Sequence, residues 1–270
     1  CFVITGIRHV NTLPFQDRPY PLNRTYTYTK LPGRNEMVIG LTYDLRDEYL
    51  AAGYTDEETA EFDSITTIDA LHDALTACGH VVERTGNVKT LAARLASGAR
   101  WDLVFNIAEG LHGFAREAQV PTLLEMYGIP YTFSDPMRLS LCLHKGMAKR
   151  VMRDLGLPTA EFALVETHAD LEHIDMKYPL FAKPVAEGTG KGVSCSSLIT
   201  GRTELERVCA ALLDKYRQPV LVERYLPGRE FTVGIIGSGT AARVIGVLEL
   251  HLSERAEANA YSFTNKECFE

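Results

Sequence analysis

A glycine-rich segment in the second half of the chain carries the sharpest chemical signal in the sequence. Its alternating glycines let backbone amides approach a polyanion, and a hydroxyl and an ammonium stand between them. Lys183 lies in an apolar run just upstream, where an ammonium without an anionic partner would be costly. We therefore predict a site for a phosphate-bearing ligand. The segment comprises Glu187, Gly188, Thr189, Gly190, Lys191 and Gly192.

The segment departs from two familiar phosphate-binding patterns. A P-loop needs GxxxxGK followed by Ser or Thr, but Val185 occupies the first glycine position and Gly192 follows Lys191. The dinucleotide pattern GxGxxG also fails, and the segment joins two predicted strands without opening a helix. Taken alone, the segment could equally be a flexible hairpin tip.

Composition excludes several classes of protein. In 270 residues, 28 basic side chains against 35 acidic ones give a net charge of 28 − 35 = −7, without the basic cluster that a nucleic-acid-binding protein needs. The most apolar long window, Phe231 to Leu252, contains Arg243 and Glu249, so it is unsuited to cross a membrane as a helix. The six cysteines lie far apart without a CxxC pair, which is typical of reduced thiols in a cytoplasmic protein.

The elements that would position these residues alternate regularly in the first half of the chain. Short apolar runs predict strands, and apolar residues at helical spacing predict helices between them, which favours a parallel sheet covered by helices. Ligands of such sheets bind beyond the carboxyl ends of the strands, where Glu109 falls. The predicted strands are 37–43, 81–86 and 101–110, and the predicted helices are 63–78 and 88–96.

The pattern changes after residue 135. A helix is predicted over 145–155, closed by Gly156 and Pro158, and strands then dominate. Their period-two alternation and the turn at 237–239 favour antiparallel pairing, which implies a second architecture and a domain boundary near residue 135. The predicted strands are 178–185, 192–199, 219–226, 229–236 and 242–250, interrupted by one helix over 203–216.

The first 36 residues differ from the rest. They contain four of the twelve prolines, five basic and two acidic side chains, and no sustained helical or strand period. The chain opens with Cys1, and the first methionine is Met37. We expect the native start to lie near Met37 and residues 1–36 to be a disordered or non-native leader.

Several fragments of the sequence, taken in their order along the chain, resemble those of a known family. FNIAEG, EAQVPTLLEMYGIPYTFSD, HKGMAKRVM, FAKPVAEGTGKGV, VLVERYLPGREFTVGII and NKE follow one another from Met37 to the chain end. In order and spacing they resemble the ATP-grasp superfamily, and within it the D-alanine–D-alanine ligase family. The resemblance implies an N-terminal parallel α/β domain over 37–135, followed by an ATP-grasp α+β domain. That domain would comprise a small subdomain over 136–222 and the start of a C-terminal subdomain over 223–270.

The resemblance assigns roles by position. Lys145 and Lys183 match two lysines that hold ATP phosphates, and Glu187 to Gly192 match the loop over the phosphates, where Thr189 takes a catalytic position. Lys266 matches a lysine on a loop that closes over the site. Asp63, with Glu61 and Glu109 nearby, is the best match to the carboxylate that binds the first substrate's ammonium; the alternative role of Asp63 is helix N-capping. The nucleotide positions continue with Glu223, Arg224, Tyr225 and Leu226 at adenine and Glu230 at ribose.

The implied reaction is ATP-dependent joining of two amino acids through an acyl phosphate, which serves peptidoglycan synthesis for the cell wall. Its partners would be small amino acids, without nucleic acid or membrane, and a homodimer stays open. Such chemistry depends on phosphate neutralisation, positioning and water exclusion more than on a protein nucleophile. Two alternatives stay open: an ATP-grasp ligase for another acid and amine, and a nucleotide-binding module without turnover.

Departures from the family pattern concentrate near the amino-acid sites. His144 stands where the family has aspartate before Lys145, Gly190 replaces a loop serine, and residues 115–118 replace a glycine-rich acidic stretch. The resemblance therefore defines the use of ATP better than it defines the two substrates. The family's Mg²⁺ ligands and the arginine at the acyl oxygen follow the loop of Lys266, so we expect them beyond residue 270. No metal ligand is assigned within the 270 residues, and we expect these residues alone to lack turnover.

Overall fold

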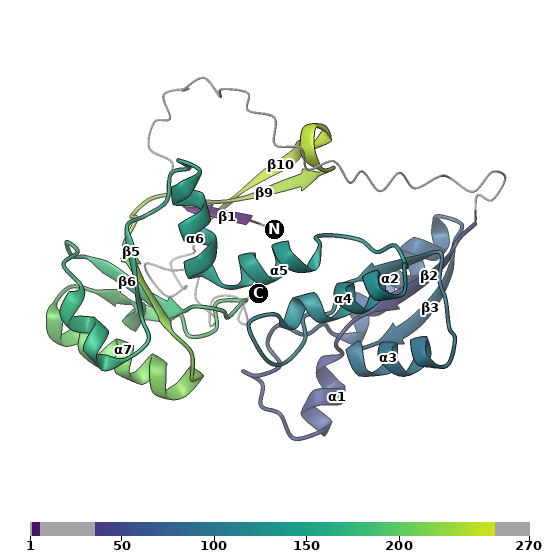
Figure 1. Ribbon diagram of the computed structural model, residues 1–270, viewed down its shortest axis with the longest axis horizontal. Coiled ribbons are helices and arrows are strands. Elements are labelled where there is room, and N and C mark those ends of the chain that lie inside the picture. The colour runs from purple at the N-terminus through teal and green to yellow at the C-terminus, as the bar shows by residue number, and fades with distance from the viewer. Residues whose placement is uncertain (1, 6–35, 252–270) are drawn as a thin grey trace. The chain divides into compact units, whose positions relative to one another are not determined.

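The computed structural model describes residues 2–5 and 36–251, which fall into two compact units (Figure 1). One unit contains residues 36–225, and the other contains residues 2–5 and 226–251. Within these described ranges, no helix is both long and apolar enough to span a membrane.

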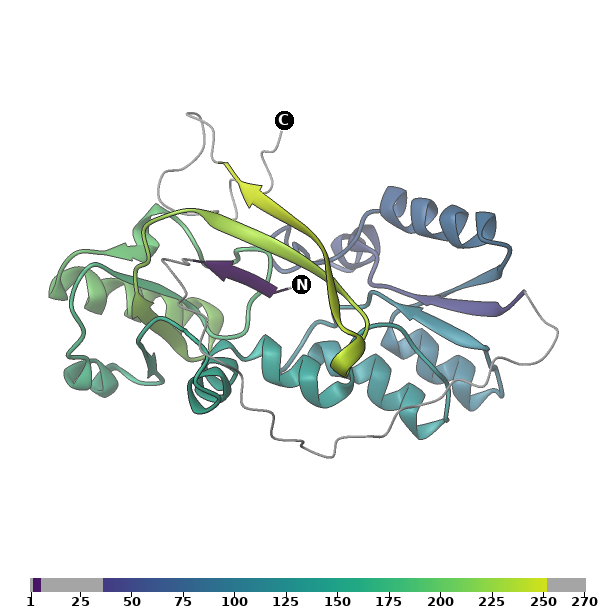
Figure 2. The same cartoon turned by 90° about the horizontal axis from the view of Figure 1, so that it is seen from above.

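The larger unit begins with a three-stranded parallel sheet. β2 (Val38–Thr42) lies between β3 (Val81–Gly86) and β4 (Leu103–Asn106) and pairs in parallel with both. Figure 2 shows α2 (Ile65–Ala77) on one face of this sheet and α3 (Val88–Ala96) with α4 (Gln119–Met126) on the other. The predicted alternation of strands and helices is confirmed here. The short helix α1 (Arg46–Ala51) follows β2 and was not predicted.

Polar caps set the starts of the two predicted helices. The Ser64 hydroxyl accepts a hydrogen bond from the Thr67 N–H at the start of α2, and Asn87 accepts from Lys89 and Thr90 at the start of α3. N-capping by Asp63, the alternative role for that residue, is therefore wrong, because Ser64 is the cap. The carboxylate of Asp63 stays available for another role.

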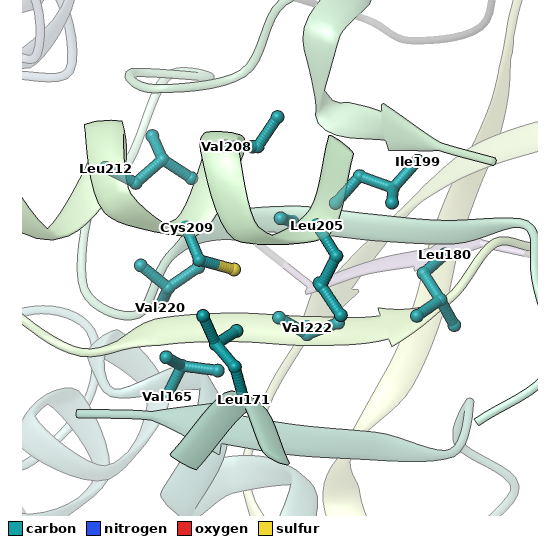
Figure 3. Close-up of a cluster of buried hydrophobic side chains, with 11 residues drawn as sticks. Val165, Leu171, Leu180, Ile199, Leu205, Val208, Cys209, Leu212, Val220 and Val222 are labelled. Carbon is teal, nitrogen blue, oxygen red and sulfur yellow. The ribbon is translucent and has the colours of Figure 1, made fainter. Parts of the chain in front are cut away.

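The larger unit continues with an antiparallel sheet covered by a long helix. Its strand order is β5-β8-β6-β7, and every neighbouring pair is antiparallel as predicted. Figure 3 shows apolar side chains of the helix α7 facing those of the strands, including Leu205 and Val222, both fully buried. This cluster fixes the sheet that carries Lys183 and Glu223. The elements are α5 (Pro136–Leu143), α6 (Lys145–Asp154), β5 (Phe162–Val165), β6 (Leu180–Pro184), β7 (Leu198–Ile199), α7 (Arg202–Tyr216) and β8 (Val220–Arg224).

One predicted strand in this sheet is mostly wrong. Only Leu198–Ile199 of the range 192–199 pair as a strand, since a 3-10 helix over Cys195–Ser197 precedes them. Ser194 caps that helix: its hydroxyl accepts from the Ser196 N–H, and the Ser197 hydroxyl accepts from the Ser194 N–H. Serine side chains that bond nearby backbone in this way compete with strand pairing.

The smaller unit is a three-stranded antiparallel sheet. β9 (Glu230–Ile236) lies between β1 (Phe2–Thr5) and β10 (Arg243–Leu250). Within residues 1–36, for which we expected a disordered or non-native leader, the β-branched and aromatic residues Phe2–Thr5 pair with the backbone of β9. Residues 1 and 6–35 lie outside the described residues, so the expectation is untested there.

Candidate functional site

Lys145 and Lys183 flank the start of the glycine segment. Lys145 is the first residue of α6, and its backbone N–H donates to the Val185 carbonyl at the end of β6 (2.9 Å). Its ammonium donates to the Glu187 carbonyl (2.5 Å). Burial, and then the nearby charge of Lys183, lower the pKa of Lys145 to about 8. The two predicted phosphate lysines are thus near enough for their charges to interact.

Lys183 has an anionic partner, as predicted for an ammonium in an apolar strand. Its ammonium lies 2.6 Å from Glu223 Oε1, and the ammonium of Lys149 lies 2.8 Å from Glu223 Oε2. Burial acts to raise the pKa of Glu223, but the two lysines outweigh it and hold the pKa below its usual value. Sequence reasoning missed Lys149, although its position one helical turn after Lys145 places both on one face of α6.

The glycine segment has a defined backbone conformation. Thr189 has a φ of +52°, and Gly190 and Gly192 have φ of +81° and +73°. The Lys191 N–H donates to the Gly188 carbonyl (2.9 Å), and the Lys191 ammonium lies 2.5 Å from Glu187 Oε2. The other Glu187 oxygen accepts from the Gln218 amide (2.6 Å). The charge of the Lys191 ammonium is therefore neutralised by Glu187, a carboxylate of the same segment.

Glu61 joins the first half of the chain to this segment. Glu61 Oε2 lies 2.8 Å from Arg116, and both side chains are 6% exposed. Glu61 Oε1 accepts from the Gly188 N–H (2.7 Å) and lies 3.6 Å from the Lys191 ammonium. Burial acts to raise the pKa of Glu61, but Arg116 and Lys191 hold it below its usual value. Sequence reasoning placed Glu61 at the amino-acid substrate and missed Arg116; in the structure both oxygens of Glu61 have protein partners.

Asp63 and Glu109 lie on either side of a buried aspartate. Asp44 follows β2, and one of its oxygens accepts from the N–H groups of Glu109 (3.0 Å) and Gly110 (2.9 Å). The backbone N–H of Asp63 donates to the Asp44 carbonyl (3.1 Å). Burial, and then the charge of Asp44, raise the pKa of Asp63. Asp44, which sequence reasoning missed, thus positions both predicted substrate carboxylates at the carboxyl end of the parallel sheet, where β2 and β4 end.

The Glu109 carboxyl is surrounded by other acids. Burial, and then the charges of Glu117 and Glu61, raise its pKa to about 8. Because this pKa lies above the ordinary 4.5, folding is favoured by the proton on Glu109 below about pH 4.5, and that contribution is lost as pH rises to about 8.

We expect Glu109→Gln to remove this pH dependence. Between pH 5 and 8 the free energy of unfolding should fall about 1–3 kcal/mol less in the variant than in the unaltered protein; solvent at this partly exposed carboxyl reduces the full linkage value. Urea unfolding at several pH values measures the difference. The exposed Glu172→Gln serves as control, and a parallel pH profile for both variants would contradict the expectation.

The remaining predicted positions are distributed more widely. Arg224 ends β8, and the Tyr225 ring stacks on Phe181 with centroids 6.1 Å apart. Leu226 and Glu230 belong to the smaller unit. Lys266 lies outside the described residues. Among residues 2–5 and 36–251, no group of three or more His, Cys, Asp or Glu side chains could hold a metal ion.

Chemically, the arrangement suits an anion with several charges. Lys145 and Lys191 contact the glycine segment, the charge of Lys183 lies near Lys145, and the present partners of these lysines are internal carboxylates and a carbonyl. A polyphosphate entering here could replace those partners with charge-assisted contacts of its own.

Comparison with known proteins finds similarity to D-alanine–D-alanine ligases. The sequence profile of the family described as "D-ala D-ala ligase C-terminus" matches residues 151–268. A D-alanine–D-alanine ligase of Chelativorans sp. is 33% identical over 202 residues, which cover 74% of this chain and 61% of the relative. The protein y4sG of Sinorhizobium fredii is 33% identical over 193 residues, which cover 69% of this chain and 56% of the relative. The chain thus spans less than two thirds of the length of these relatives.

Solved structures share the fold. The D-alanine–D-alanine ligase of Bacillus anthracis superposes with a TM-score of 0.56 at 17% identity, covering 80% of this chain and 72% of that one. The VanG D-Ala:D-Ser ligase of Enterococcus faecalis gives a TM-score of 0.60 at 18% identity, with coverage of 82% and 71%.

Proposed function

Because the chain belongs to the D-alanine–D-alanine ligase family of ATP-grasp proteins, we propose that its function is the ATP-dependent joining of two amino acids. The observation that carries this proposal is the Lys145 ammonium, which donates to the Glu187 carbonyl of the glycine segment and lies near enough to Lys183 for the two charges to interact, as two cations around a triphosphate would. The names of the relatives support ligation, and one neighbouring structure, the Bacillus anthracis ligase, is complexed with ATP.

The reaction transfers one phosphoryl group and forms one amide bond. A carboxylate oxygen of the first amino acid attacks the γ-phosphorus of ATP, and the bond from that phosphorus to the β-phosphate bridging oxygen breaks to release ADP. The amine of the second amino acid then attacks the acyl carbon, loses a proton, and displaces inorganic phosphate. Lys145 and Lys183 would stabilise the phosphate charges, and the glycine segment with Thr189 would cover the phosphates and exclude water.

The other assignments follow the same proposal. Glu223, Arg224, Tyr225 and Leu226 would border adenine, Glu230 would face the ribose, and Lys266 would approach the phosphates. Asp63 and Glu109 would bind the first amino acid. We place the reaction in the cytoplasm, in synthesis of peptidoglycan. The family implies Mg²⁺, but the described residues supply no ligand set for it, so we derive no step through a metal.

The test is release of ADP by the full-length protein that carries this sequence. With ATP and MgCl₂ present, ADP should accumulate only when amino acids are added, and a panel of D- and L-amino acids identifies the acid and the amine. A preference outside D-alanine and D-serine would indicate a ligase for a different pair. ATP binding without ADP release on any panel member would favour a nucleotide-binding module without turnover.

The pKa of Lys145 makes a separate prediction about pH. ATP binds best to the charged ammonium, and this group loses its proton above about pH 8. The affinity for ATP should therefore be nearly constant well below pH 8, begin to fall near pH 8, and approach a fall of about tenfold for each pH unit above it. Calorimetric titrations between pH 7.5 and 9.5 measure this fall, and Lys145→Met should abolish it. An affinity of the unaltered protein that does not change over this range would contradict the placement of Lys145 at the phosphates.

A further inference from the structure

Arg116 occupies a buried position between the two halves of the larger unit. It lies in a 3-10 helix over Arg116–Ala118, after the parallel sheet, and its guanidinium is almost fully enclosed. One end donates to the Ala186 carbonyl (2.9 Å), immediately before the glycine segment, and the other donates to Glu61 (2.8 Å). The backbone fits closely as well, because a Cβ on Gly110 would lie 2.6 Å from the Arg116 carbonyl oxygen.

Glu61 extends this contact into the glycine segment. Its carboxylate accepts from the Gly188 N–H and lies near the Lys191 ammonium. A Cβ on Gly188 would lie only 3.1 Å from the Glu61 carboxyl carbon, so the backbone reaches the carboxylate at close range. A chain of contacts therefore runs from Arg116 through Glu61 to the two ends of the segment's first turn.

A gain in folding stability does not by itself explain the buried ion pair of Arg116 and Glu61. The desolvation cost of two buried ions often cancels their attraction, whereas the fixed fork of a guanidinium defines geometry well. The guanidinium here spans the start of the segment and the carboxylate that holds its first turn. Its geometry therefore fixes where the amide of Gly188 and the ammonium of Lys191 lie.

We propose that Arg116 is a positioning residue for nucleotide binding: through Glu61, it holds the glycine segment in the conformation that receives the phosphates. This inference rests on the proposed use of ATP. Arg116 itself need not touch the nucleotide.

The test combines Arg116→Lys with Glu61→Gln in a double-mutant cycle. Lysine keeps the positive charge but loses the fork, and glutamine keeps an oxygen that can accept from Gly188. Two quantities are measured in each protein: amide hydrogen exchange at Gly188 and Lys191 without nucleotide, and calorimetric affinity for the ATP analogue AMP-PNP with MgCl₂. Arg94→Lys is the matched control, because Arg94 pairs with Glu83 and shares no partner with the segment.

Arg116→Lys should speed exchange at these two amides and weaken AMP-PNP binding, each by about tenfold, with the thermal midpoint nearly unchanged. In the Glu61→Gln background the same substitution should change each quantity by less than about threefold, because Arg116 acts through Glu61. Arg94→Lys should change neither quantity.

Unchanged exchange in Arg116→Lys, or losses that multiply in the double variant, would overturn the proposal. An unfolded Arg116→Lys protein would also overturn it, since Arg116 would then be needed for the fold itself. If the unaltered protein fails to bind AMP-PNP, the proposed function fails, whereas the exchange rates still decide whether Arg116 positions the segment.

Discussion

Replacing Lys183 with methionine is expected to weaken ATP binding by about tenfold to a hundredfold, corresponding to about 1.5–3 kcal/mol for one charge-assisted contact. The loss should occur in a folded protein. Glu223, the present partner of Lys183, would keep its second lysine, Lys149, at 2.8 Å, so no buried carboxylate is left unpaired. Calorimetric titration with ATP and MgCl₂ measures the change.

Lys89→Met is a suitable control for the Lys183 variant. Lys89 is an exposed lysine on α3, and its loss removes the same charge from the protein without touching the glycine segment. Its ATP affinity should equal that of the unaltered chain. Equal affinities for Lys183→Met and Lys89→Met, with both proteins folded, would remove Lys183 from the phosphate site.

Gly192→Ala is expected to destabilise the protein and disorder the end of the glycine segment. Gly192 has a φ of +73°, and an added Cβ would lie 2.4 Å from Pro184 Cγ and 3.0 Å from Tyr216 Cε2. The left-handed backbone costs about 1–2 kcal/mol for alanine, and overpacking adds about 1–3 kcal/mol. The free energy of unfolding in urea should therefore fall by at least about 2 kcal/mol, and ATP affinity should fall with it.

Gly201→Ala separates this effect from the general cost of altering a glycine. Gly201 precedes α7 with a φ of −163°, and nothing lies within 4 Å of the Cβ that would be added. The control should unfold within about 0.5 kcal/mol of the unaltered protein. A Gly192→Ala protein as stable as this control would mean that the segment adopts a different conformation in solution.

The sequence allowed much of the fold to be predicted, because regular elements leave regular patterns. The parallel strands at 37–43 and 81–86, the helix at 88–96 and the antiparallel pairing after residue 135 are all confirmed. The predicted ATP-grasp fold is likewise confirmed by the likeness to solved ligases. The four-residue strand β5 was missed because it is too short to show a period.

The candidate site was predictable only in part, since the residues that sequence reasoning found were those with a local signal. Lys183 stood out as an ammonium in an apolar strand, and the segment at 187–192 by its glycines. Arg116 and Asp44 act through contacts to residues 55 and 65 positions away, and no local pattern encodes such a separation. The prediction also gave Glu223 only an adenine-side role, whereas its carboxylate holds two lysines.

The central claim is phosphorylation of an amino-acid carboxylate by ATP, and transfer of an oxygen isotope tests it most directly. The full-length protein is supplied with ATP, MgCl₂, the amine substrate and a first amino acid whose carboxylate carries ¹⁸O. Formation of an acyl phosphate followed by attack of the amine moves one carboxylate oxygen into each inorganic phosphate released, so mass spectrometry should find one ¹⁸O atom per phosphate. Phosphate free of ¹⁸O, released while the two amino acids are joined, would contradict the account.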